Sequence, residues 1–361
     1  MDFSYKFPAV KGIQASKEYY IAMIPLKLLS RLFIDEEDYV PPEYRAQRRL
    51  NISRIPVISD YILSNRDSYV FSALAASVDG EYQFSPIGIA EDIGVLEISM
   101  DAHLMIVDGQ HRKASIIQAI SEDSTLNNET IPIVLYEDQG LERSQQMFTD
   151  LNKHAVKTSN SISELYDSRD DLAVATRKII TAVPFFNEYT DKEKDNLGKY
   201  SSNLFTLNVF YKANRRILHG SSLEKRDEDF LIKFWTGVAE NIVPWLELQN
   251  HGISKSELRE NYIVTQAVAI QAFGRVGAYF FSEKKKLQAQ TMSRLREIDW
   301  TRTNPKWHLR TIQANGRMIT NEAAIILTAN IIKMAIGLPL NEDEQNRETE
   351  FKNRHEIEVE G

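Results

Sequence analysis

Apolar residues follow two different periods along the chain. Up to residue 165, apolar runs of strand length mingle with short helical patterns, whereas from 166 to 340 the apolar spacing is helical almost throughout. The predicted strands are 19–25, 69–74, 95–98, 104–107 and 131–136, and the main helical patterns are 141–151, 161–186, 223–248, 257–281 and 322–336. We therefore expect an α+β fold, with a mixed α/β N-terminal domain (1–165) followed by an α-helical domain (166–340).

The runs 95–98 and 104–107 flank a polar segment and predict a β-hairpin. The second run leads directly into Asp108-Gly109-Gln110-His111-Arg112, after which apolar residues recur at helical spacing. The order is therefore strand, tight turn, helix. We expect Asp108 to cap the helix and Gly109 to permit the chain reversal.

The predicted turn concentrates groups that bind anions. Backbone N–H groups, the positive end of the helix dipole, and the side chains of His111 and Arg112 would converge there, which favours a phosphate ligand. The same residues also allow a plainer interpretation. Asp108 would then only cap the helix while His111 and Arg112 face solvent.

The pentapeptide 108–112 resembles the signature of the DGQHR-domain family, and the chain resembles the DndB branch of that family, which belongs to bacterial DNA phosphorothioation clusters. Residues 54–62, 147–156 and 304–307 resemble further boxes of the family. The same order of boxes resembles, more distantly, the ParB/sulfiredoxin superfamily, whose turn binds nucleotide phosphates. The resemblance thus implies a ParB/sulfiredoxin-like N-terminal domain.

The resemblance also implies a set of nucleotide- or phosphate-binding residues: Arg54, Asp108, Gly109, Gln110, His111, Arg112, Asn152 and Lys153. Asn152 and Lys153 are equally typical of a helix end without any ligand. Gln110 lies where sulfiredoxin has its reactive cysteine, and this chain has no cysteine. Thiol-based reduction of a sulfinic acid is therefore excluded, as are disulfides and thiolate metal sites.

Charge is unevenly distributed. The formal net charge is −8, and residues 341–361 contain eight acidic and three basic residues, so they contribute −5 and the preceding residues only −3. We expect 341–361 to be a disordered acidic tail. The body of the chain is then close to neutral, and local basic patches can dominate its field.

Two basic clusters are candidates for DNA binding. Arg45, Arg48 and Arg49 would share one helical face, and Lys212, Arg215 and Arg216 follow two aromatic residues. Either cluster could instead be a solvated helix face. Neither forms a standard recognition motif, so base readout is not predicted.

Two functions follow from these patterns. The first, implied by the resemblance, is a DNA-binding repressor of a phosphorothioation gene cluster that binds duplex promoter DNA and modulates sulfur modification. Operator symmetry suggests a homodimer, and other Dnd proteins are expected partners. The absence of a signal-peptide pattern and of any apolar run of membrane length favours the cytoplasm.

The second function is an enzyme that binds ATP or another NTP at the turn and hydrolyses it, with or without coupling to DNA nicking. Asp108 and His111 would be its catalytic residues, with His111 donating a proton to developing negative charge. Mg²⁺ would enter with the nucleotide, held by Asp108 and Asp150. A third interpretation is a scaffold that bridges sulfur-transfer partners.

Overall fold

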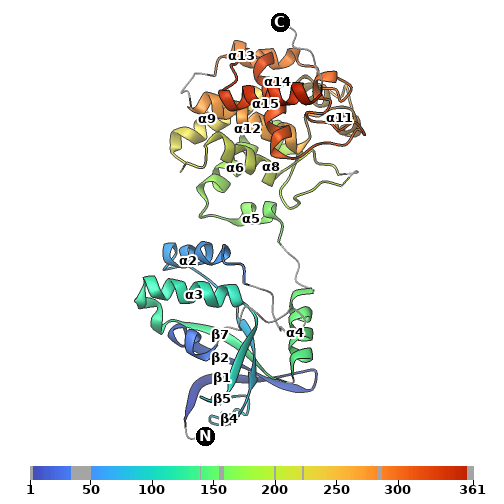
Figure 1. Cartoon of the computed structure of the whole chain (residues 1–361). Helices are drawn as coiled ribbons and strands as arrows, with labels where there is room; N and C mark the ends of the chain where they lie inside the picture. The colour runs from blue at the N-terminus through green and yellow to red at the C-terminus, as the bar shows by residue number, and fades with distance from the viewer. Residues whose placement is uncertain are drawn as a thin grey trace. The chain divides into compact units, whose positions relative to one another are not determined.

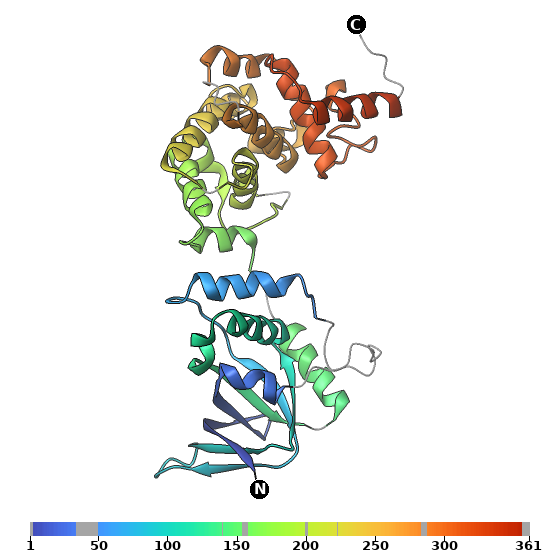
Figure 2. The same ribbon diagram turned by 60° about the vertical axis from the view of Figure 1, so that its left-hand side comes forward.

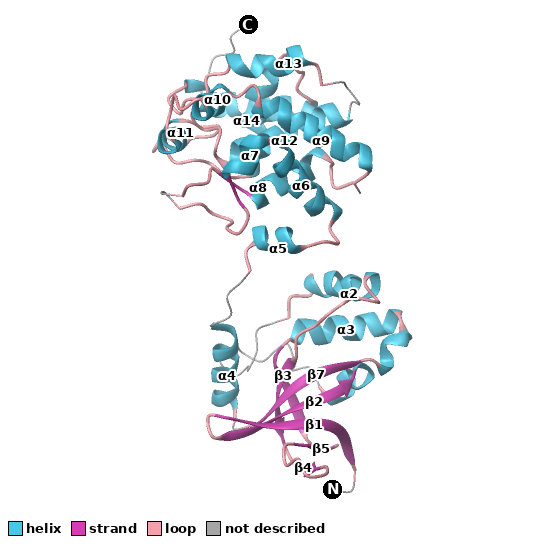
Figure 3. Cartoon of the chain, turned by 180° about the vertical axis from the view of Figure 1, so that it is seen from behind, coloured by secondary structure: helices cyan, strands magenta, loops and turns pink. Residues whose placement is uncertain are grey.

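The structure is a computed structural model. It describes residues 3–33, 50–138, 140–153, 158–198, 201–221, 223–282 and 287–355. The chain divides into two compact units, Met1–Val156 and Lys157–Gly361. Figure 3 shows that strands gather in the first unit, whereas the second is almost entirely helical. Helical and strand regions are thus segregated along the chain.

The N-terminal unit is built on a seven-stranded sheet with strand order β4-β5-β1-β2-β7-β3-β6. Neighbouring strands are antiparallel except β3 and β7, which are parallel. The strands are β1 Ser4–Gln14, β2 Lys17–Pro25, β3 Leu74–Asp79, β4 Tyr82–Pro86, β5 Ile93–Ser99, β6 His103–Asp108 and β7 Thr130–Glu137. The unit is therefore a mixed α+β structure with a mostly antiparallel sheet.

Two helices, α2 (Arg54–Ser64) and α3 (Gln110–Glu122), lie side by side over one face of this sheet (Figures 1 and 2). Ile116 and Ala119 of α3 are buried against it, together with Ile62 of α2. The remaining helical segments of the unit are η1 Leu26–Leu28, α1 Leu29–Leu32, η3 Ser124–Asn128 and α4 Leu141–Lys153. Burial of one apolar face on each helix is what fixes α2 and α3 on the sheet.

Two predictions about the sheet are wrong. The buried strand expected at 69–74 begins only at Leu74, because the segment before it lies outside the sheet. The expected hairpin of 95–98 with 104–107 does not form: β5 pairs with β1 and β4, and β6 pairs with β3. The partner β1 was not predicted, because only Phe7 and Ala9 along its length are buried and this short alternation does not stand out in the sequence.

The C-terminal unit packs its helices around a buried aromatic core. The helices are α5 Asn160–Tyr166, α6 Asp171–Ala182, α7 Pro184–Tyr189, α8 Leu207–Ile217, α9 Lys225–Ala239, α10 Val243–Gln249, α11 Lys255–Asn261, α12 Ala267–Ser282, α13 Ala289–Ser293, α14 Glu322–Ala335 and α15 Glu342–Arg354, with short 3₁₀ segments η4 Arg294–Glu297 and η5 Pro305–Trp307 and strands β8 Thr190–Asp191 and β9 Phe205–Thr206. Helices α8 and α12 cross closely, since a Cβ at Gly274 would lie 2.8 Å from the Ala213 carbonyl oxygen.

The disordered acidic tail is also a wrong prediction for the residues that the structure describes. Asn341 caps α15 with a capping box, Glu344 forms a buried ion pair with Lys333, and Glu348 forms one with Arg310. Glu344, Glu348 and Phe351 recur at helical spacing and form the buried face of α15. Composition could not reveal this, because the neutralising cations lie on other segments.

Among the described residues, none of the helices is both long and apolar enough to cross a membrane.

Candidate functional site

The predicted turn joins β6 to α3. Gly109 has φ +99° and is itself the N-cap of α3, so the expected capping by Asp108 does not occur. A Cβ at Gly109 would lie 2.4 Å from Cδ2 of Leu74. Glycine is therefore required here both by the backbone conformation and by the contact with β3.

Arg112 is used to hold the turn in place. Its Nη1 donates to the carbonyl oxygens of Ser72 and Ala73, each at 2.8 Å, and to the Ser72 hydroxyl at 2.6 Å. Its Nη2 pairs with Asp108 Oδ2 at 2.7 Å. The guanidinium thus makes four polar contacts within the N-terminal unit, and Asp108 balances its charge.

His111 is oriented by the segment before α2. Its Nε2 accepts a hydrogen bond from the Asn51 backbone N–H at 2.9 Å, which assigns the ring proton of the neutral form to Nδ1. Burial, and after it the charge of Arg54, lowers the pKa of His111. Nε2 is therefore an acceptor here, and the donor of the neutral ring is Nδ1.

Helices α2 and α3 run in the same direction. The Asn51–His111 hydrogen bond joins their N-terminal ends, and at the other end Arg66 lies 3.1 Å from Asp123 and donates to Thr125 at 3.0 Å. Two positive dipole ends therefore share one corner. Arg54, the first residue of α2, is exposed there. We call the group of Arg54, Gly109, Gln110 and His111 the α2/α3 corner.

The other residues expected at this site are not brought to it by any described contact. Asn152 and Lys153 are the last residues of α4, and their side chains lie outside the described residues, as do Arg45, Arg48 and Arg49 entirely. Asp150 accepts a hydrogen bond from Gln146 at 2.7 Å and lines a pocket with Tyr19 and Tyr136. Within the described residues no three His, Asp or Glu side chains are placed to hold a metal ion.

The second predicted cluster, Lys212, Arg215 and Arg216, lies on α8 in the C-terminal unit. It borders an open depression of about 640 Å³, which we call the basic trough. The trough is lined by Lys212, Arg215, Arg216 and His219 of the α8 region, Gln271 of α12 and Glu322 of α14. Three cations thus face one carboxylate, a net charge of +2 with His219 neutral.

The cations of the trough differ in how far they are neutralised. Arg216 forms a bidentate pair with Glu322, both distances 2.6 Å, and donates to Gln271. Hydrogen bonding from Arg216 holds the pKa of Glu322 below its usual range. Lys212 and Arg215 are exposed, and neither forms an ion pair with a described residue. His219 and Glu322 were not predicted. His219 follows α8 closely in the chain, whereas only the fold brings Glu322 beside α8.

The comparison with known families covers almost the whole chain. Residues 7–339 match the family model DndB, described as DNA-sulfur modification-associated. No curated protein and no solved structure matches, so the resemblance to the ParB/sulfiredoxin superfamily stays a prediction. The chain belongs to the DndB family of proteins associated with DNA sulfur modification.

Proposed function

We propose that this protein is a DNA-binding regulator of DNA sulfur modification that contacts duplex phosphates through the basic trough. The observation that carries the proposal is the pair Lys212 and Arg215, which are exposed beside an open depression and form no ion pair with a described carboxylate. Binding of such cations to DNA phosphates releases the counterions of the DNA backbone, which favours association. Membership of a family associated with DNA sulfur modification supplies the biological context.

The finer proposal is a transcriptional repressor of its own phosphorothioation gene cluster, as the family resemblance implies. Promoter recognition should then appear as a ratio of at least ~10³ over random duplex DNA. A homodimer would match the two-fold symmetry that operators commonly have. Other Dnd proteins remain proposed partners.

The test is the dependence of DNA affinity on salt. In the double variant Lys212→Met/Arg215→Met, the slope of log affinity against log salt should fall by about 0.9 per lost phosphate contact, about 1.8 in all. Fluorescence anisotropy with labelled promoter duplex measures it. The matched control is Lys178→Met/Arg226→Met, two exposed cations of the same unit that pair with Glu228 and Glu224. Equal slopes in wild type and the trough variant would contradict the proposal.

A second candidate function is nucleotide binding at the α2/α3 corner, with or without hydrolysis. Two parallel helix N-termini and the exposed Arg54 favour an anion there. Against catalysis by the turn, Arg112 is held by Asp108 and two carbonyls, and His111 Nε2 is already an acceptor. Loss of ATP binding in Arg54→Ala, with promoter affinity intact, would favour this candidate.

A further inference from the structure

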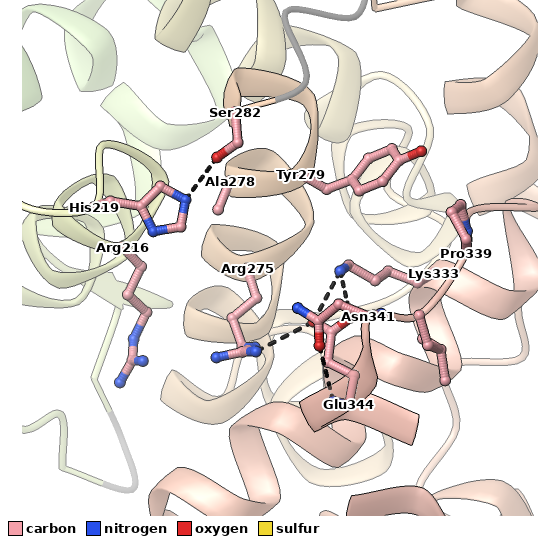
Figure 4. Close-up of a pocket in the computed structure, with 11 residues that line it drawn as sticks. Arg216, His219, Arg275, Ala278, Tyr279, Ser282, Lys333, Pro339, Asn341 and Glu344 are labelled. Atoms are coloured by element: carbon pink, nitrogen blue, oxygen red, sulfur yellow. Dashed lines mark hydrogen bonds and ion pairs between the residues drawn. The ribbon is translucent and has the colours of Figure 1, made fainter. Parts of the chain in front are cut away.

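A second depression in the C-terminal unit adjoins the basic trough. It has a volume of about 490 Å³ and lies between α8, α12, α14 and the N-terminus of α15 (Figure 4). We call it the α15 pocket and define it by Arg216, His219, Arg275, Tyr279, Lys333 and Glu344. Its volume lies within the range of about 300–1,000 Å³ typical of small-molecule sites.

Charge in the α15 pocket is positive even after internal pairing. Glu344 is bound by Lys333 Nζ at 2.7 and 2.8 Å and by Arg275 Nη2 at 3.2 Å. The side chains of Lys333 and Glu344 are only 4% and 1% exposed, so this pair is a fixed part of the wall. Arg216 is held by Glu322. Three cations therefore share two carboxylates, which leaves one positive charge.

Arg275 is the cation that is least well satisfied. Its Nη1 lies 3.9 Å from Glu322, too far for a hydrogen bond, so this nitrogen keeps its donors for a ligand in the pocket. Its Nε is buried without an acceptor and out of reach of a ligand. An unsatisfied buried donor costs about 1–3 kcal/mol. The guanidinium therefore has both charge and hydrogen-bonding capacity left for an incoming anion.

The other side of the pocket offers apolar contact. Tyr279 follows Ala278 on the same helix, and Leu340 precedes α15. Figure 4 shows Tyr279 on the side of the pocket away from His219, with Arg275 below both of them. Lys333 Nζ lies 5.3 Å from the centre of the Tyr279 ring. Arg275 and Tyr279 thus line one cavity, with Lys333 next to the Tyr279 ring.

We propose that the α15 pocket binds a nucleoside phosphate, with its phosphate against Arg275 and its base against Tyr279. A phosphate would supply the acceptors that Arg275 lacks, because phosphate oxygens match the geometry of a guanidinium. A planar base can stack on a tyrosine ring. This site is separate in sequence from the DGQHR turn and uses none of its residues.

Occupancy of the pocket should also weaken DNA binding. Arg216 and His219 line both the α15 pocket and the basic trough, so a phosphate held in the pocket adds negative charge beside the trough. This step rests on the proposed function, whereas nucleotide binding itself does not. Coupling between the two ligands is reciprocal, so DNA should lower nucleotide affinity by the same factor.

The experiment is calorimetric titration of the full chain, without DNA, with the mono- and triphosphates of the four ribonucleosides and with inorganic phosphate. We expect at least one nucleotide to bind tighter than phosphate, and Arg275→Gln to weaken it about tenfold or more, as expected for loss of a charged hydrogen bond. Arg275→Lys keeps the charge beside Glu344 and should weaken binding in the same direction. Arg226→Gln, an exposed arginine of the same unit, is the matched control.

Two results would overturn the proposal. One is the absence of binding by every nucleotide tested. The other is nucleotide binding that Arg275→Gln and Arg275→Lys leave unchanged and Arg54→Ala abolishes, which would place the ligand at the α2/α3 corner. Circular dichroism of each variant confirms folding. Promoter affinity is measured separately, so that a failure of the proposed DNA binding by the trough can be told apart from a failure of nucleotide binding by the pocket.

Discussion

Arg112 in the turn and Arg215 near the trough are both arginines close to a helix end, but their surroundings differ. Arg112 donates to the carbonyls of Ser72 and Ala73 and pairs with Asp108, so it fixes the chain between β6, α3 and β3. Arg215 is exposed and forms no ion pair within the described residues. The distinctive motif of the sequence is thus used for structure, and the less distinctive cluster is left open to solvent.

A distinctive sequence motif therefore does not by itself indicate that its functional groups are free to bind a ligand. Asp108 and Arg112 pair with each other here, and Arg54 is the one exposed residue of the α2/α3 corner. Variants can test these two roles, because substitution of a structural residue lowers stability, whereas substitution of a binding residue lowers DNA affinity.

The largest effect is expected for Arg112→Met. The change leaves Asp108 without its cation and two carbonyls without their donor, so unfolding free energy should fall by about 2–4 kcal/mol. Urea denaturation measures it. Promoter affinity of the folded fraction should change less than about threefold, since a lost phosphate contact would be needed for more. A loss of affinity without loss of stability would reverse the roles assigned to the two regions.

The next effect concerns Gly109. Gly109→Ala should cost about 2 kcal/mol, because the new Cβ meets Leu74 and the residue keeps a positive φ. Gly140→Ala is the matched control, since Gly140 has φ +93° but nothing within 4 Å of the added Cβ. It should show only the cost of the backbone conformation, about 1 kcal/mol. An equal loss of stability in the two variants would mean that the contact of Gly109 with β3 contributes nothing.

The sequence predicts the structure correctly where the determining contacts are local. The order of strand, turn and helix around Gly109 follows from a short apolar run, a glycine and a helical period. The apolar spacing at 161–186, 223–248, 257–281 and 322–336 predicts the regions of α5–α7, α9–α10, α11–α12 and α14, whereas α8, α13 and α15 were not predicted. Gly337, with φ +78°, lies two residues past α14 as expected for a helix end.

Contacts whose partner lies far away in the chain could not be predicted from the sequence. Ser72 and Ala73 are about forty residues from Arg112, so its internal role could not be seen. The acidic residues of α15 look solvated until Lys333 and Arg310 are placed beside them. Charge balance in a folded protein is a tertiary property, and composition alone describes only the total.

A smaller effect is expected for Glu164, whose carboxyl interacts electrostatically with Lys212 of the basic trough. Burial, and after it the charge of Asp195, raises the pKa of Glu164 to about 7, while Lys212 opposes the shift. A raised pKa means that the carboxyl contributes most stability at low pH and loses it as pH rises from about 4.5 to about 7.

Glu164→Gln, which stays neutral, should therefore be more stable than wild type at pH 8 by about 1–2 kcal/mol after allowance for solvent screening, with little gain at pH 5. Urea denaturation at both pH values measures the difference. Lys212→Met should raise the pKa of Glu164 further, because an exposed cation is removed. A gain that is equal at both pH values would show that the carboxyl is not titrating.

The smallest effect is expected at His111. Burial and the charge of Arg54 lower the pKa of His111, so the folded state favours the neutral ring. The stability that this contributes is fully present above the unfolded pKa of about 6.5. It is lost as the pH falls through the lower pKa of the folded state. Protonation of Nε2 would break the hydrogen bond from Asn51, worth about 0.5–1 kcal/mol. NMR titration of the imidazole should give a midpoint below 6.5 that rises in Arg54→Ala and stays unchanged in Arg143→Ala on α4. An upward-shifted midpoint in the wild type would mean that His111 faces an anion-binding site in its charged form, and the turn would then resemble the trough after all.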